Sequence, residues 1–416
     1  MSFQPVSSSQ RIELLDLLRG FALFGILMVN MSIFCNPHTI MFGNFSIWQD
    51  PESKAATWFI RFFFEGKFYV LFSLLFGMGF QLFLQKIDES REVLPLYRRR
   101  LMILLLFGAL HVVFLWFGDI LVWYALFGFV MTWFRKKSNR TLLTWSLVFM
   151  FIPVVAMSIL MLLMEMARNI PEAAENMATS MAAQQQAMKD LTSQAYTVYA
   201  NGSFAEQIRF RLTEYANLLG GIIFFYPNTL AMFLLGMIFM RKGMLTQPAL
   251  HKSFFKKLLT YTLPVGLAGA YILASYSPQI SQSDPGWLNV LVMFSHTQGG
   301  TALALSYLAL IVMCSQANRF GWLRQKLAST GRMALTNYLM QSIIVTTLCF
   351  SYGLGLYGKV SPLQGIFISL TIYIIQLFLS DLWLKRFRYG PMEWLWRSLT
   401  YGKRLGFRKA PPAISE

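Results

Sequence analysis

The chain has 416 residues, of which 56% are hydrophobic and 13% are charged, and its mean hydropathy is +0.49. A soluble globule of this length needs more polar surface than this composition supplies, so the composition excludes an ordinary soluble protein and indicates one covered by lipid. The formal net charge is +17. Because the basic residues gather in alternate loops, we attribute this charge to membrane orientation and expect no nucleic-acid partner.

Apolar stretches of about 17–25 residues, the length that a helix needs to cross a bilayer, recur along the whole chain. They predict an all-α polytopic bundle of about ten transmembrane helices. The expected spans are 12–34, 67–86, 100–117, 119–134, 141–164, 217–240, 254–276, 287–315, 333–354 and 362–384. No repeat or linker divides the sequence, so we expect a single transmembrane domain over residues 1–416.

The distribution of Lys and Arg predicts the orientation of this bundle. The loops after the second, fourth, sixth and eighth spans and the tail after the tenth are rich in basic residues, whereas the loop 35–57 contains only Lys54 and the loop 355–361 only Lys359. By the positive-inside rule, both termini are expected to be cytoplasmic. Nothing at the N-terminus resembles a removable signal peptide, so the first helix is expected to stay as an anchor.

Two segments differ from the short loops. Residues 165–215 contain a run rich in Met, Ala and Gln, which has high helix propensity and predicts an external helical insert. This insert is either a lid over a cavity or a solvated helical hairpin without a catalytic role. Residues 58–68, with the sequence WFIRFFFEGKF, predict an amphipathic helix in the outer membrane interface.

The cysteines are Cys35, Cys314 and Cys349. They are too few and too scattered to predict a disulfide framework or a zinc site, and we expect no metal. Cys35 and Cys349 both fall near the expected outer face. The favoured interpretation is that they pack as small apolar groups.

Ionisable side chains inside apolar spans are costly, so each one is a functional candidate unless it has a structural partner. The sharpest pair is His111, near the outer end of the third span, and Asp119, in the tight turn that follows. Histidine exchanges protons near neutrality, and a carboxylate orients it, so the pair is expected to be a general base and its orienter. The alternative is that His111 bonds a backbone carbonyl and Asp119 only caps the next helix.

The first span contains three further candidates. Asp16 and Arg19 are three residues apart and can form an ion pair, which is the structural explanation for both. Arg19 and Asn30 are eleven residues apart, so they project from nearly the same face of the helix. A polar stripe of this kind indicates either a lined cavity or a seam between helices.

Other polar groups are expected to converge on the same cavity as substrate-binding candidates, namely Lys67, His296, Gln298, Asn337 and Gln341. Lys67 begins the second span, and its alternative role is to extend to the membrane interface. Asn337 and Gln341 share one face of the ninth span because they are four residues apart.

Five motifs occur in order along nearly the whole chain: LDLLRGFALFGILMVN, KFYVLFSLLFGMG, LFGALHVVFLWFGDILVWYALFG, GRMALTNYLMQS and GPMEWLWRSLTYG. Together they resemble the YeiB-like family, known as domain of unknown function 418 (DUF418). The resemblance implies a multi-pass protein of the bacterial inner cell membrane. The opening LDLLRGFA is more distantly similar to the membrane acyltransferases that acetylate bacterial surface polysaccharides and to the heparan-glucosaminide N-acetyltransferase group.

This distant similarity implies transfer of an acyl group from cytoplasmic acyl-CoA to an acceptor beyond the membrane. In the polysaccharide enzymes a histidine stands at the position of Asn30. Asparagine cannot act as a base, so Asn30 is left to orient a substrate or to stabilise an oxyanion. His111 is the better replacement for the missing base, and His38 in the external loop is a weaker one.

The sequence therefore favours an acyltransferase in which Arg19 binds the phosphates of acyl-CoA and His111, Asp119 and Asn30 carry the chemistry. Acyl-CoA is expected as a co-substrate and no bound cofactor is expected. The acceptor would be an external glycan or lipid headgroup, with membrane lipids as partners. Two alternatives remain open: a transporter or exporter whose path is lined by the same groups, and a structural or sensory membrane protein without enzymatic activity.

Overall fold

A computed structural model describes residues 12–42, 47–86, 93–221, 224, 226–280, 286–316 and 321–409. Over these ranges the chain is helical, and the only strand-like pairing is an isolated bridge between Phe387 and Arg408. The helices are α1 Glu13–Phe34, α2 Pro51–Phe63, α3 Phe68–Lys86, α4 Val93–Phe114, α5 Leu121–Phe134, α6 Asn139–Arg168, α7 Pro171–Asn201, α8 Phe204–Leu219, α10 Pro227–Arg241, α11 Lys252–Tyr276, α12 Trp287–Phe294, α13 Gly300–Gln316, α14 Gly321–Arg332, α15 Ala334–Cys349, α16 Pro362–Arg386 and α17 Pro391–Tyr401. Shorter helical turns are η2 His38–Phe42, η3 Pro248–His251, η4 Ser277–Gln279 and the π-helical turn η5 Ser295–Gly299.

In the described part of the chain, six helical stretches are long and apolar enough to cross a membrane: Glu13–Phe34, Pro51–Gln85, Asn139–Arg168, Pro248–Gln279, Trp287–Gln316 and Pro362–Arg386. Three shorter helices, α5, α10 and α15, are also apolar. The chain is therefore an all-helical integral membrane protein.

The structure corrects the expected limits of three spans. The stretch 217–240 is divided between α8 and α10, because two glycines follow α8 and Pro227 begins α10. The stretch 287–315 contains the π-helical turn η5 between α12 and α13. The stretch 333–354 is helical only to Cys349, after which the chain turns.

The helices differ sharply in how much of their surface is covered. In the most apolar 18-residue stretch of α1, 61% of the residues are buried, against 11% in α6. We infer that α1 lies inside the bundle and that α6 faces lipid. The helices α3 and α10 approach each other closely, since a Cβ atom on Gly236 would lie 2.1 Å from the carbonyl oxygen of Leu74.

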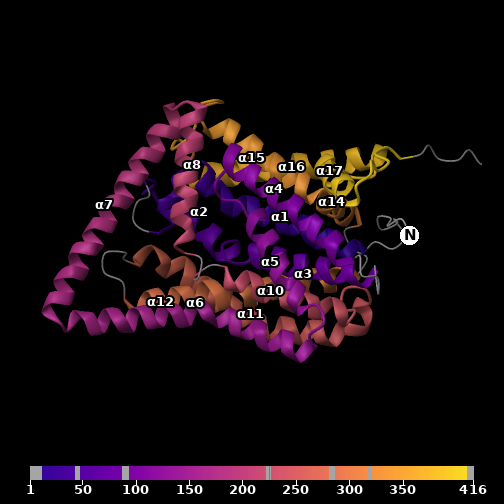
Figure 1. The fold of residues 1–416 in the computed structure, drawn as a ribbon, viewed down its shortest axis with the longest axis horizontal. Coiled ribbons are helices and arrows are strands. Elements are labelled where there is room, and N and C mark those ends of the chain that lie inside the picture. The colour runs from indigo at the N-terminus through magenta and orange to yellow at the C-terminus, as the bar shows by residue number, and fades with distance from the viewer. Residues whose placement is uncertain are drawn as a thin grey trace, which may run out of the picture.

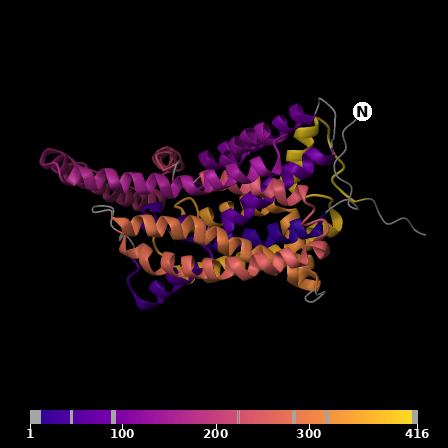
Figure 2. The same ribbon diagram turned by 90° about the horizontal axis from the view of Figure 1, so that it is seen from below.

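The expected insert 165–215 is helical. Figure 1 shows α7 crossing one end of the molecule obliquely, from the end of α6 to α8, with α14 and α17 at the opposite end. Figure 2 shows that the α6–α7 corner reaches beyond the other helices. The insert contacts the rest of the protein through α8 and the second half of α7, while its α6–α7 corner projects beyond the other helices.

The expectation that Cys35 and Cys349 pack as free apolar groups is wrong. Their sulfurs form a disulfide, with the two Cα atoms 5.4 Å apart, which joins the end of α1 to the end of α15. The two residues are separated by 314 positions, and although both are expected near the outer face, only the packing of α1 against α15 brings their sulfurs together. Cys314 is a free, exposed cysteine.

The disulfide predicts a specific labelling pattern. In denaturant without reductant, we expect a thiol reagent to modify Cys314 alone, and after reduction to modify Cys35 and Cys349 as well, as counted by intact-protein mass spectrometry. The Cys314→Ser variant is the control, since it should take up no label before reduction. Cys35→Ala should lower the free energy of unfolding by about 2–5 kcal/mol. Labelling of every cysteine without reductant would contradict the bond.

Candidate functional site

His111, near the end of α4, lies at the centre of a buried polar network. Its Nδ1 is 3.0 Å from Oδ2 of Asp119, and its Nε2 is 2.8 Å from Oγ of Ser342 on α15. All three side chains are buried. A carboxylate, an imidazole and a hydroxyl in series is the arrangement in which a base, oriented by an acid, activates a nucleophile.

Asp119 both faces the imidazole and caps a helix. Its other oxygen, Oδ1, accepts a hydrogen bond of 2.7 Å from the backbone N–H of Val122 in the first turn of α5. Gly108 of α4 leaves room for this turn, because a Cβ atom there would lie 2.6 Å from that same nitrogen. The two roles considered for Asp119 are thus combined in one carboxylate, which the cap holds in place.

The network fixes how His111 can act. Nδ1 of His111 and Oδ2 of Asp119 are in ion-pair contact without the alignment of a hydrogen bond, whereas Nε2 is hydrogen-bonded to Oγ of Ser342. In the tautomer that carries its proton on Nδ1, beside the carboxylate, Nε2 accepts this bond from the hydroxyl. The ring of Tyr338 lies against the imidazole, with centroids 5.1 Å apart. The basic nitrogen of His111 is therefore directed at Ser342, a residue that the sequence did not single out.

A cavity of about 100 Å³, here called the inner cavity, adjoins this network. Asn30 of α1 lines it, together with Tyr338, Gly118 and Tyr69. Of the four side chains expected to border one cavity, namely Arg19, Asn30, His111 and Asp119, only Asn30 is among its lining residues. His111 and Asp119 lie directly behind it, because Tyr338 contacts the imidazole and Gly118 precedes Asp119.

Asp16 and Arg19 form the expected ion pair, with Nη1 of Arg19 3.0 Å from Oδ1 of Asp16. Asp16 is buried, whereas the side chain of Arg19 is 28% exposed. Arg19 lies eleven residues from Asn30, about 16 Å along the helix axis, so it stands at the other end of α1 from the inner cavity.

Lys67 does not extend to the membrane interface. It is fully buried, and its Nζ donates a hydrogen bond of 2.7 Å to the backbone carbonyl of Arg61. Gly66, with a φ of +82°, forms the turn between α2 and α3 and packs against the backbone of His296. The imidazole of His296 stacks on Tyr69, which lines the inner cavity. Lys67 and His296 therefore lie beside that cavity without lining it.

Three other candidates join helices instead of converging on the cavity. Gln298 donates a hydrogen bond of 2.7 Å to a backbone carbonyl of α6. Asn337 donates to Oγ of Ser380 at 3.0 Å, and Gln341 donates to Oε1 of Gln376 at 2.8 Å. The bonds of Asn337 and Gln341 form a polar seam between α15 and α16. Joining helices in this way is a common role of amide side chains in bundles.

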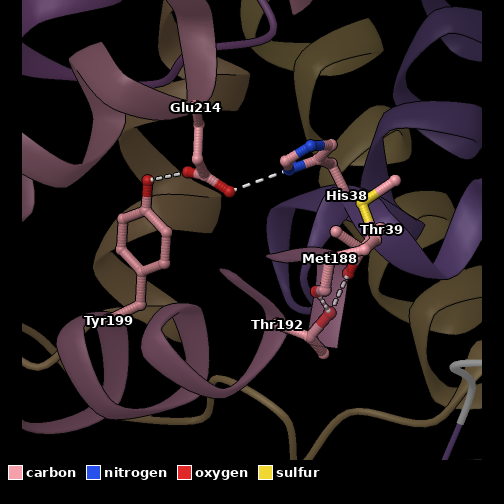
Figure 3. Close-up of polar contacts among 6 residues, drawn as sticks. All are labelled: His38, Thr39, Met188, Thr192, Tyr199 and Glu214. Carbon is pink, nitrogen blue, oxygen red and sulfur yellow. Dashed lines mark hydrogen bonds and ion pairs between the residues drawn. The ribbon is translucent and has the colours of Figure 1, made fainter. Parts of the chain in front are cut away.

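A second buried network lies where the insert meets the bundle (Figure 3). Nδ1 of His38, in η2, is 2.9 Å from Oε1 of Glu214 on α8, and the hydroxyl of Tyr199 on α7 donates to the other oxygen of Glu214. Burial raises the pKa of Tyr199 well above its ordinary value, and the nearby Glu214 carboxylate raises it further, so the phenol remains a donor. His38 therefore binds the insert instead of replacing the missing base.

Sequence reasoning missed this second network because its members come from three separate elements. Oγ1 of Thr39 also meets Oγ1 of Thr192 on α7, at 2.7 Å (Figure 3). Both contacts hold the insert to η2, the helical turn that follows α1. In the part of the chain that the structure describes, no group of three or more His, Cys, Asp and Glu side chains is placed to hold a metal ion.

The second network predicts a large effect of one carboxylate. Glu214→Ala should leave the buried polar groups of His38 and Tyr199 without their shared acceptor, and so lower the free energy of unfolding by about 2–5 kcal/mol. Thermal unfolding and limited proteolysis within α7 measure this. Glu175→Ala, an exposed carboxylate of α7, is the matched control and should change neither. Equal melting temperatures for the two variants would show that the network does not hold the insert.

The family model described as protein of unknown function (DUF418) matches residues 239–403. The uncharacterized protein YxaH of Bacillus subtilis (strain 168) is 36% identical over 96% of this chain and 96% of its own. The uncharacterized protein YeiB of Escherichia coli (strain K12) is 29% identical over 98% of this chain and 99% of its own. No solved structure matches this chain. The chain belongs to the YeiB-like DUF418 family.

Proposed function

We propose that this protein is a membrane acyltransferase that moves an acyl group from a cytoplasmic acyl-CoA to an acceptor at the outer face. The observation that carries the proposal is the series Asp119, His111 and Ser342, with contacts of 3.0 and 2.8 Å, beside a cavity lined by Asn30. This series supplies a nucleophile, a base and an orienter in one buried network.

Because Nε2 of His111 faces Ser342, the serine is the group that the base activates. Oγ of Ser342 attacks the thioester carbonyl while His111 takes the hydroxyl proton, and Asp119 stabilises the imidazolium. The C–S bond then breaks, and the CoA thiolate leaves with the proton from His111. Ser342 is left as an ester.

The second half of the reaction reverses the proton path. An acceptor hydroxyl or amine gives its proton to His111 and attacks the ester carbonyl, and Oγ of Ser342 leaves with that proton. Asn30, Tyr69 and Tyr338 are the polar side chains that line the inner cavity, and Tyr338 also contacts the imidazole of His111. Asn30 and Tyr338 are the two considered for the oxyanion. We assign to them the hydrogen bonds that stabilise the oxyanion in both steps.

The donor would enter from the end of α1 that carries Arg19. Arg100 of α4 lies over the ring of Trp396 on α17, next in sequence to Arg397, so basic side chains gather at this end and favour the phosphates of acyl-CoA. In this assignment Arg19 binds the donor and Asp16 holds it in position. Lys67 and His296, which are expected from the sequence to bind substrate, are assigned instead to supporting the wall of the inner cavity.

The orientation follows from two independent features. Basic loops favour a cytoplasmic location for the end that carries α14 and α17, and the Cys35–Cys349 disulfide favours an oxidising, external location for the opposite end. We propose one membrane domain of about ten spanning helices in the bacterial inner membrane, with both termini cytoplasmic and the insert outside. The six long apolar stretches, the three shorter ones and α4 together supply these spans.

A single-turnover experiment tests the chemistry without knowledge of the acceptor. Purified protein in lipid nanodiscs is incubated with acetyl-CoA, and both free CoA and acetylated protein are measured. We expect acetylation at Ser342, its loss in Ser342→Ala, and a rate about 10²–10⁴-fold lower in His111→Gln. Ser342→Cys should carry the acetyl group as a thioester.

Ser369→Ala is the matched control, because Ser369 is also a fully buried serine of a spanning helix. It should acetylate at the wild-type rate. If wild-type protein releases no CoA while Ser342→Ala and His111→Gln lower only the melting temperature, the network is structural and the acyltransferase proposal fails.

A further inference from the structure

A larger cavity, here called the outer cavity, lies between the end of α1, α2, α11 and the start of α16. Its volume is about 490 Å³, within the range of sites that bind small molecules. It lies at the same end of the bundle as the Cys35–Cys349 disulfide, which joins the end of α1 to the end of α15. In the proposed orientation it therefore opens at the outer face.

One side of α2 supplies the charged wall of this cavity. Lys54, Thr57, Trp58 and Arg61 follow the spacing of a single helix face, and Glu65 continues it one turn further. Glu65 forms an ion pair with Arg61, with Oε2 of Glu65 3.6 Å from Nε of Arg61. These lining residues carry two positive charges and one negative charge, so the wall favours an anion.

Two indole rings are held at the cavity by hydrogen bonds. Nε1 of Trp48 donates to Oδ1 of Asn36 at 3.4 Å, and Nε1 of Trp58 donates to Oγ of Ser275 at 3.1 Å. Both rings line the same cavity as Lys54 and Arg61, together with amide and hydroxyl groups that can bond to a polar headgroup.

The adjoining surface of α2 is apolar. Trp58, which lines the cavity, is 37% exposed, and its ring stacks on that of Phe62 with centroids 4.8 Å apart. An amphipathic helix with exposed aromatic residues lies in the membrane interface, with its apolar side in the acyl chains. A ligand in the outer cavity therefore has both a basic polar pocket and a lipid surface next to it.

We infer that the outer cavity binds the headgroup of an anionic phospholipid, with the phosphate against Lys54 and Arg61 and the acyl chains along Trp58 and Phe62. Val29 lines both the outer and the inner cavity, so it marks the point where the bound headgroup lies nearest to Asn30. That this lipid is the acceptor rests on the proposed function. The binding itself does not.

Native mass spectrometry of the detergent-purified full chain tests the binding in the absence of acyl-CoA. The probes are phosphatidylglycerol, the zwitterionic phosphatidylcholine and soluble glycerol phosphate. We expect phosphatidylglycerol to bind more tightly than the other two, and the double variant Lys54→Gln/Arg61→Gln to bind it about tenfold more weakly or worse. The backbone contact of Arg61 with Lys67 remains in this variant.

Lys189→Gln/Arg209→Gln is the matched control, since it removes the same charge from exposed positions of the insert and should bind as the wild type does. Lys54→Glu, at an exposed position, should weaken binding without a change in melting temperature. Equal binding of phosphatidylcholine, equal loss in the control, or full competition by glycerol phosphate would overturn the inference. Lipid binding without acetylation of Ser342 would sustain the inference and refute the proposed function.

Discussion

The fold depends on one buried imidazole that satisfies two partners at once. In the apolar interior of a membrane bundle, an ionisable side chain is stable only when its polar atoms are matched. His111 is held by a hydrogen bond between Nε2 and Ser342 and by the ion-pair contact of Nδ1 with Asp119, which together tie α4, the turn into α5 and α15 to a single point. The same geometry directs the basic nitrogen at a hydroxyl. The contacts that hold the buried His111 in place are thus the same contacts that the proposed base uses.

The two ends of the bundle differ in chemistry, and this difference gives the proposed reaction a direction. One end carries basic residues of α4, α17 and the C-terminal segment. The other carries the Cys35–Cys349 disulfide, the insert held by Glu214, and the outer cavity. An anionic donor is favoured at the first end and an external acceptor at the second. The inner cavity at Asn30 lies between them, so an acyl group has to cross only the central part of the protein.

The sequence predicts the all-helical membrane fold because apolar length and basic loops act locally. It also predicts the pairs Asp16–Arg19 and His111–Asp119, since both lie within short stretches of the chain. It does not predict Ser342, Glu214 or the disulfide, because these contacts join helices far apart in sequence. It places Gln298, Asn337 and Gln341 on helix faces, but only the packed bundle shows that these faces are seams.

The proposed transfer to an external acceptor requires that the cavity at Asn30 be reached from the outer face. Single cysteines at Ser32, Asn30 and Leu23, in a Cys314→Ser background that keeps the disulfide, test it with a membrane-impermeant thiol reagent applied to intact cells. Ser32 lines the outer cavity, Asn30 lines the inner one, and Leu23 is fully buried. The account predicts fast labelling of Ser32→Cys, slower labelling of Asn30→Cys and none of Leu23→Cys. Labelling of Asn30→Cys only from the cytoplasmic side of inverted vesicles would contradict it.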